Sequence, residues 1–318
     1  MRVLGISMQQ IRRTMQDYSI KSIRNEFKSK GVFYTPKELG EKLKSFVDVE
    51  YKNVYDPTCG RGYLLSVFGD DVVKYGQEID EEALKEAKTN LNNFIGEVGD
   101  TIKEDKFKNM KFDLIVANPP FSIKYEPTKE LEEDERFKDL PCLAPASKAD
   151  YMFIAHCLAK LKDSGQAIIL NFPGILYRKA REYKIRKCLV DNNFIEKVIH
   201  IKGDTFVDTK IATCILVLKK QRTDNNVLFV DTENDLEYLA TYEEVVQNDY
   251  TLSVSNYVIK EEEKEVVDPA ELQKNAHEAF RKKIIKELEF TRMVCVLEGW
   301  DFKSYVMDIL SLVRNFLD

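Results

Sequence analysis

A β-rich run passes into a glycine-containing loop and then a helical pattern in the segment Asn53-Val-Tyr-Asp-Pro-Thr-Cys-Gly-Arg-Gly-Tyr-Leu-Leu65. From about residue 51 to residue 220 the chain repeats this alternation of short β-rich runs and helical patterns. The patterns predict strands at 53–55, 72–76, 94–96, 112–117 and 166–170, with helices at 80–93 and 148–162. Alternating strands and helices predict a parallel, doubly wound sheet that is covered on both faces, and so an α/β protein of the Rossmann-like kind.

The later part of the chain changes this pattern. Two β-rich runs, at 194–201 and 211–218, are separated by too few residues for a helical crossover, which predicts an antiparallel pair. The runs together predict a mostly parallel, seven-stranded sheet with one antiparallel strand. Helical spacing at 8–30 and on either side of Gly299 predicts short helical extensions at both termini. The expected organisation is an N-terminal extension (1–30), a catalytic domain (31–258) and a C-terminal helical tail (259–318).

Composition limits the class of protein. The 318 residues include 48 Lys+Arg and 54 Asp+Glu, a net charge of −6, and 44% are hydrophobic, which excludes a disordered chain and argues against binding nucleic acid by charge alone. The six cysteines form no C-x-x-C pair and are expected to be reduced, mostly buried thiols, with no metal site. No apolar run approaches the length of a membrane span, so we expect a soluble, unsecreted protein of the cytoplasm.

Chemistry is expected in the glycine-containing loop. Gly60 and Gly62 would let the backbone approach a ligand closely at a helix N-terminus. Leu65 stands where a dinucleotide fingerprint has its third glycine, which disfavours a pyrophosphate site. Asp56, directly before the loop, suits a ligand that carries a positive charge.

Two further acids follow the next two predicted strands. Glu78 ends the second strand, where a carboxylate accepts hydrogen bonds from both hydroxyls of a ribose, and Asp100 follows the third, where it would accept one from an adenine amino group. Each acid alone would equally suit a strand end or a helix cap. Because Asp56, Glu78 and Asp100 follow three consecutive strands, we favour one shared ligand site.

The fourth strand runs into Asn118-Pro-Pro-Phe121. The two prolines fix φ and remove two N–H donors, so the nearby carbonyls are available as acceptors. A side-chain amide oxygen and a backbone carbonyl could hold the two hydrogens of an exocyclic amine, and Phe121 offers a face on which a base can stack. Without the surrounding motifs, this segment would be read as a proline-rich loop.

Together these segments resemble the modification subunits of type I restriction-modification systems, a family of S-adenosylmethionine-dependent DNA adenine-N6 methyltransferases. The resemblance covers about residues 31 to 258 and implies the class I methyltransferase fold. The matching segments, in the order of the family, are GVFYTP (31–36), DPTCGRGYLL (56–65), GQEID (76–80), GDT (99–101), NPPF (118–121), DERF (134–137), APASKADYMF (144–153), FPGILYR (172–178), IATCILVLKK (211–220) and NDYTLSVSNYV (248–258).

The resemblance implies roles for residues. The implied cofactor-binding residues are Tyr34, Thr35, Pro36, Asp56, Thr58, Gly60, Gly62, Glu78, Asp100, Thr101 and Asn118. The implied catalytic residues are Asn118, Pro119, Pro120 and Phe121. The implied reaction needs no metal: a methyl group passes from S-adenosylmethionine to an adenine flipped out of double-stranded DNA.

The chain departs from the family pattern in three ways. Arg61 stands where a small residue is usual, and it is expected to point either to the cofactor carboxylate or, as we favour, to solvent. Only about 30 residues precede GVFYTP, where the family usually has a long helical domain. Nothing after residue 220 has the roughly 100 residues that a target-recognition domain needs. Sequence specificity is therefore expected from a separate specificity subunit, with the terminal helices docking that subunit or a second copy of the chain.

A basic segment follows the FPGILYR motif. Arg178, Lys179, Arg181 and Lys184 are candidates for DNA phosphate contacts. The other interpretation is the solvated face of an ordinary helix.

Two other functional classes stay open. Protein glutamine-N5 methyltransferases share the N-P-P signature, normally with Tyr at the position of Phe121, and an RNA methyltransferase belongs to the same class. A non-catalytic cofactor-binding scaffold is the second. The intact acids and the Asn-Pro-Pro-Phe segment argue against a loss of activity.

Overall fold

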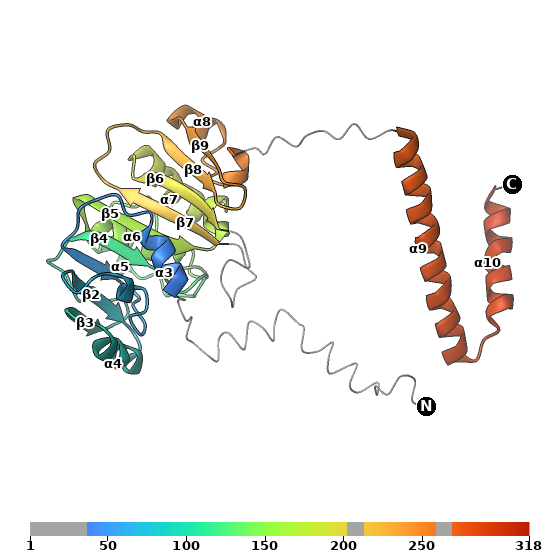
Figure 1. Cartoon of the computed structure of the whole chain (residues 1–318), viewed down its shortest axis with the longest axis horizontal. Helices are drawn as coiled ribbons and strands as arrows, with labels where there is room; N and C mark the ends of the chain where they lie inside the picture. The colour runs from blue at the N-terminus through green and yellow to red at the C-terminus, as the bar shows by residue number, and fades with distance from the viewer. Residues whose placement is uncertain (1–36, 202–212, 259–268, 318) are drawn as a thin grey trace. The chain divides into compact units, whose positions relative to one another are not determined.

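The computed structural model describes residues 37–201, 213–258 and 269–317. These residues fall into two compact units, which divide at Lys260 (Figure 1). The predicted helix at 8–30, and with it Tyr34, Thr35 and Pro36, lies outside the described residues.

The first unit is built on one mixed sheet in the order β3-β2-β1-β4-β5-β7-β6-β8-β9. Neighbouring strands from β3 to β5 are parallel, whereas β7 lies antiparallel between β5 and β6. Every strand predicted between residues 53 and 218 is present, and the predicted antiparallel pair is confirmed. The strands are β1 (Asn53–Asp56), β2 (Val73–Glu78), β3 (Phe94–Val98), β4 (Phe112–Ala117), β5 (Leu161–Asn171), β6 (Ile195–Ile201), β7 (Thr213–Lys219), β8 (Val227–Asp231) and β9 (Leu236–Ala240).

The predicted count of seven strands is wrong, because the described residues form a sheet of nine. The two additional strands, β8 and β9, form an antiparallel hairpin at one edge, and β8 runs parallel to β6. Their turn includes Asp235 with a φ of 53°. Most residues of β9 are partly or fully exposed, so this strand lacks the regular alternation of apolar and polar residues that reveals a half-buried strand.

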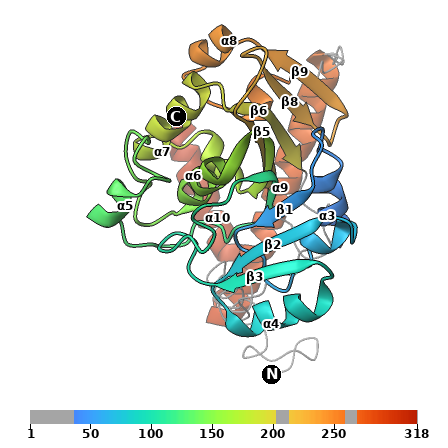
Figure 2. The same ribbon diagram turned by 90° about the vertical axis from the view of Figure 1, so that its left-hand side faces the viewer.

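Helices cover both faces of the sheet (Figure 2). Along β5, Ala167 and Ile169 join one apolar cluster while Ile168 and Leu170 join the other, as the alternation of side chains along a strand requires. Residues of α6 and α7 pack in the first cluster and residues of α3 and α4 in the second. The helices of this unit are α3 (Lys37–Lys44), α4 (Glu81–Asn90), α5 (Lys129–Glu133), α6 (Asp150–Lys160), α7 (Arg181–Asp191) and α8 (Tyr242–Gln247), with 3₁₀ turns η1 (Leu65–Val67), η2 (Pro173–Leu176) and η3 (Val254–Asn256).

The second unit is a pair of adjacent helices, α9 (Pro269–Glu298) and α10 (Phe302–Leu317). The predicted break at Gly299 is confirmed: its φ of 72° suits a glycine that ends a helix. Many of the large apolar side chains are exposed in this unit, among them Phe280, Phe290 and Leu297 on α9 and Leu312 on α10. Among the described residues, neither of these helices nor any other is apolar enough over a sufficient length to cross a membrane.

Candidate active site

A pocket of about 310 Å³ opens where the first four strands end. Strands β3, β2, β1 and β4 are neighbours in the sheet and run parallel, so their carboxyl ends meet at one edge. Sheets of this kind bind ligands at that edge. The lining includes most of the residues that the sequence singled out: Asp56, Thr58, Gly60, Arg61, Glu78, Asp100, Thr101, Asn118 and Pro120.

The glycine-containing loop has a conformation that favours glycine. Gly60 and Gly62 have φ values of 52° and 83°, in the left-handed region that other residues rarely adopt. A Cβ atom on Gly62 would lie 2.6 Å from Cδ1 of Leu91, whereas the space beside Gly60 is open. Gly62 is thus needed for packing, and Gly60 leaves room for a ligand.

The helix predicted after this loop is wrong. Only the 3₁₀ turn η1 follows, because Phe68 is extended (φ −90°, ψ 139°) and ends the turn before Gly69. The pocket therefore does not rest on the N-terminus of a long helix, and the loop backbone is fixed by side chains instead.

Glu78 is one of these side chains. Its Oε2 accepts a hydrogen bond from the backbone N–H of Gly60 at 2.8 Å, and its Oε1 accepts one from Asp80 N–H at 3.0 Å. A carboxylate has about four acceptor positions, so Glu78 shapes the loop and retains capacity for a ligand hydroxyl.

Ile79 is a pocket residue that the sequence reasoning missed. It lines the pocket, and 67% of its surface is exposed. Its signal in the sequence is an apolar residue placed between Glu78 and Asp80, in a turn where no core position is available. Such a side chain offers an apolar surface to a ring.

Asp56 is buried at the end of β1, with 2% of its surface exposed. Its Oδ1 accepts hydrogen bonds from Thr58 N–H at 2.9 Å and from the Thr58 hydroxyl at 3.4 Å. Burial raises the pKa of Asp56 to about 7, against the hydrogen bonds from Thr58 and with the help of the nearby Glu78 charge. A cationic ligand would favour the ionised form of this carboxyl.

Asp100 and Thr101 lie in the turn after β3. Asp100 Oδ1 accepts hydrogen bonds from the backbone N–H groups of Ile102 at 3.0 Å and Lys103 at 3.4 Å. Thr101 is buried, and its hydroxyl donates to the carbonyl of Pro57. The turn after β3 is thereby tied to the loop after β1.

The Asn118-Pro-Pro-Phe segment brings only part of itself to the pocket. Asn118 and Pro120 line it, Pro119 is buried, and Phe121 packs against the apolar cluster on the α3 and α4 side of the sheet. The residue after it, Ser122, has a φ of 51°.

Asp150, at the start of α6, holds this strained position. Its Oδ1 accepts a hydrogen bond from Ser122 N–H at 3.0 Å, and only 1% of its surface is exposed. Its Oδ2 lies 3.8 Å from Nη1 of Arg178. Sequence reasoning assigned no role to Asp150, although it belongs to the quoted APASKADYMF segment.

The basic segment separates into inward and outward residues. Arg178 pairs with Glu182 at 3.2 Å as well as with Asp150, and Lys179 pairs with Asp249. Arg181 and Lys184 on α7 are exposed. Of the four basic residues, only these last two are exposed and form no ion pair with another described residue.

Arg61 lines the pocket, and its Nη1 lies 3.1 Å from Glu86 Oε2 on α4 rather than pointing freely to solvent.

In the part of the chain that the structure describes, no cluster of three or more His, Cys, Asp or Glu residues is arranged to hold a metal ion. All six cysteines are free, and four of them are buried.

The fold is that of class I methyltransferases, and in this chain three acids and an Asn-Pro-Pro loop lie around one pocket at the carboxyl edge of the sheet. A putative class I S-adenosylmethionine-dependent methyltransferase from Listeria monocytogenes shares the fold, with a TM-score of 0.50, 21% identity, and coverage of 73% of this chain and 75% of that one. The chain belongs to the N-6 DNA methylase family, whose model matches residues 14–239.

Several relatives of the chain are subunits of type I restriction systems. The methylase subunit of the type I restriction enzyme MpnII from Mycoplasma pneumoniae is 36% identical, and the match covers 77% of this chain and 56% of the relative. The methyltransferase subunit of a type I restriction-modification system from Streptococcus thermophilus has a TM-score of 0.65 and 30% identity over 71% of this chain and 59% of that chain. The chain thus spans little more than half the length of these relatives.

Proposed function

We propose that the chain transfers the methyl group of S-adenosylmethionine to the exocyclic amine of an adenine in DNA, as the catalytic part of a type I modification subunit. One observation carries this proposal: Asp56, Glu78 and Asp100 share a single pocket with Asn118. The acids suit a cofactor, and Asn118 suits an amine substrate. Membership of the N-6 DNA methylase family supports the same reading.

The pocket fits the groups of the cofactor by their chemistry. Asp56 would face its positive charge, Glu78 its ribose hydroxyls and Asp100 its adenine amino group, with Ile79 beside the ring. Bound S-adenosylmethionine would supply an electrophilic methyl group on a sulfonium. Each of these acids also accepts hydrogen bonds from backbone N–H groups of the loops around the pocket, so the site is preorganised before a ligand arrives.

Asn118 and Pro119 would hold the amine that is methylated. The Asn118 side-chain oxygen and the Pro119 carbonyl accept the two amine hydrogens and direct the nitrogen lone pair toward the methyl carbon. The N–C bond forms as the C–S bond breaks, and the extra proton on nitrogen then leaves to solvent. Because an adenine amine lies inside the duplex, the base must first be extruded. Phe121 packs against the apolar cluster but is only partly buried, and we propose that its exposed part stacks on the base.

The decisive test uses tritiated methyl transfer to DNA, RNA and protein fractions, with the chain alone and with a cognate specificity subunit. Asn118→Ala is expected to keep cofactor binding and to lose methylation of DNA. Asn234→Ala, in the β8–β9 turn, is the matched control and should stay active. Label in protein or RNA instead of DNA would favour the other methyltransferase class, and a fully active Asn118→Ala variant would refute the mechanism.

Partner binding is part of this proposal. We propose that the exposed apolar side chains of α9 and α10 dock a specificity subunit or a second copy of the chain. Light scattering of the full chain and of a chain ending near residue 260 would test self-association. Identical monomers in both cases would exclude the second copy.

We further propose that DNA phosphates contact Arg181 and Lys184. Replacing both by Ala should weaken DNA binding and reduce the dependence of affinity on salt. An unchanged salt slope would contradict this contact. With a net charge of −6, we expect DNA binding by the chain alone to be weak.

A further inference from the structure

Arg136, in the DERF segment, is buried beside the pocket and has no role in the function proposed above. Only 6% of its side chain is exposed. Its Nε and Nη2 donate to the two carboxylate oxygens of Asp134 at 2.9 and 2.7 Å. The remaining donors point away from Asp134, toward a turn of the pocket and toward α6.

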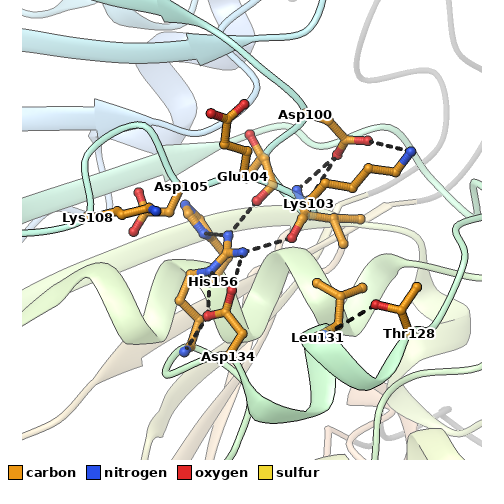
Figure 3. Close-up of polar contacts among 12 residues, drawn as sticks. Asp100, Lys103, Glu104, Asp105, Lys108, Thr128, Leu131, Asp134 and His156 are labelled. Atoms are coloured by element: carbon orange, nitrogen blue, oxygen red, sulfur yellow. Dashed lines mark hydrogen bonds and ion pairs between the residues drawn. The ribbon is translucent and has the colours of Figure 1, made fainter.

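The turn is the one that carries Asp100. Nη1 of Arg136 donates to the carbonyl of Thr101 at 2.6 Å, and Nη2 donates to the carbonyl of Ile102 at 2.8 Å. Asp100 binds the N–H side of the same turn through Ile102. Figure 3 shows Asp134 and His156 gathered on one side of the turn that holds Asp100 and Lys103. The Arg136 guanidinium therefore holds the carbonyl groups of this turn, and the Asp100 carboxylate holds one of its N–H groups.

His156 on α6 completes the support. Burial, with the positive charges of Arg136 and Lys160, holds the pKa of His156 well below its usual value, so the ring is neutral. Its Nδ1 lies 3.0 Å from Nη1 of Arg136, which can only donate, so the ring proton is on Nε2. That nitrogen lies 3.1 Å from the hydroxyl of Tyr55, the residue before Asp56.

The charge on this arrangement is balanced locally. Burial alone would raise the pKa of Asp134, but the hydrogen bonds and charge of Arg136 outweigh it and hold that pKa below its usual value. Only the Arg136 side of this ion pair is buried, since 25% of the Asp134 side chain is exposed, and such a pair adds little net stability compared with apolar residues of the same size. The distinctive feature of Arg136 is that its planar guanidinium donates hydrogen bonds to two carbonyls, those of Thr101 and Ile102, in a turn beside the pocket.

We propose that Arg136 is a positioning residue for the cofactor: it holds the Thr101 and Ile102 carbonyls and so fixes the direction of Asp100 toward the adenine amino group. This inference rests on the proposed function. It predicts that loss of Arg136 harms recognition of the adenine amino group specifically, rather than cofactor binding in general.

The test measures binding of two ligands to the full chain by calorimetry. S-adenosylhomocysteine carries the 6-amino group, and S-inosylhomocysteine has an oxygen in its place. Arg136→Gln should weaken S-adenosylhomocysteine binding about tenfold, equivalent to about 1.4 kcal/mol. It should change S-inosylhomocysteine binding less than twofold. Equal weakening of both ligands, or no weakening of either, would overturn the proposal.

A matched control separates positioning from loss of structure. Arg222 is also a buried arginine that donates to backbone carbonyls, at Ile195 and Asn226, and it lies outside the pocket lining. Arg222→Gln should lower thermal stability and leave the ratio of the two affinities unchanged. A shift of that ratio in Arg222→Gln equal to the shift in Arg136→Gln would mean that only general loosening was measured.

A second variant covers the case in which Arg136→Gln does not fold. Asp134→Asn keeps the Arg136 guanidinium and its carbonyl contacts but removes the negative charge that anchors it. The ratio of the two ligand affinities should therefore change in the same direction as in Arg136→Gln, but by less. If the unmodified chain binds neither ligand, the proposed function fails together with this inference. If it binds S-adenosylhomocysteine and both variants keep the ratio, only the role of Arg136 fails.

Discussion

The affinity for S-adenosylmethionine should fall about tenfold between pH 8 and pH 6 because of Asp56. The pKa of this buried carboxyl is raised to about 7, so about nine-tenths of it is ionised at pH 8 and about one-tenth at pH 6. A cationic ligand binds the ionised form, and its apparent affinity follows that fraction. Three titratable groups lie near Asp56, and burial raises the pKa of each of them: Tyr55, Cys59 and Cys157. These three groups therefore stay neutral between pH 6 and pH 8. The charge of the nearby Glu78 is one cause of the raised pKa of Asp56.

The same carboxyl should affect the stability of the ligand-free protein. Its pKa is higher in the folded chain than in the unfolded chain, where it is near 3.8, so the folded chain binds more protons between these values. The contribution of Asp56 to the free energy of unfolding is therefore fully present below about pH 4 and is lost as pH rises through about 7. The total loss is on the order of 4 kcal/mol. Asp56→Asn should raise the melting temperature at pH 8 and leave it nearly unchanged at pH 4.

Calorimetry at pH 6, 7 and 8, in two buffers of different ionisation enthalpy, measures both the affinity and the protons released on binding. At pH 6 the unmodified chain should release close to one proton as the ligand ionises Asp56. Asp56→Asn serves as the control because it retains any titration of the ligand itself. The reasoning is refuted if the affinity of the unmodified chain does not change with pH, or if Asp56→Asn shows the same dependence.

Substitutions at three further positions test the pocket and its support. Asp150→Ala removes the acceptor for Ser122 N–H at 3.0 Å, so the methylation rate should fall tenfold or more with little change in cofactor affinity, and Asp150→Asn should restore most of it. Lys160→Met breaks a buried ion pair with Asp105 (2.8 Å) and should lower the free energy of unfolding, measured in urea, by about 3–5 kcal/mol; a loss below about 1 kcal/mol would contradict this reasoning. Ile79→Ala should weaken cofactor binding without lowering the melting temperature, since this side chain is already 67% exposed, and unchanged binding would remove it from the site.

Much of the site was predictable because its signals are local. Glycine at positions 60 and 62 is favoured by the left-handed φ of each residue, and at position 62 also by the close contact with Leu91. Asp56, Glu78 and Asp100 follow strands that are parallel neighbours, and parallel strands end at one edge. Strand alternation also places the core, because side chains two residues apart face the same side.

The errors have equally local causes. The edge strand β9 is mostly exposed and lacks an apolar period, and the short strand β8 beside it was not predicted either, although its burial alternates. The apolar residues after Gly62 have helical spacing, yet they form only the 3₁₀ turn η1, which ends at the extended residue Phe68. Short segments such as these are decided by the neighbours they meet rather than by their own pattern.

The sequence by itself determined the succession of strands, the glycine loop and the order of acids and Asn-Pro-Pro-Phe along the chain. Only the tertiary structure decided which side chains support them. Arg136 reaches the turn after Asp100 across 35 positions of the chain, and Asp150 reaches Ser122 across 28. Such contacts leave no periodic signal, because the fold, and not the spacing of residues, brings a donor to the carbonyl or N–H that it satisfies.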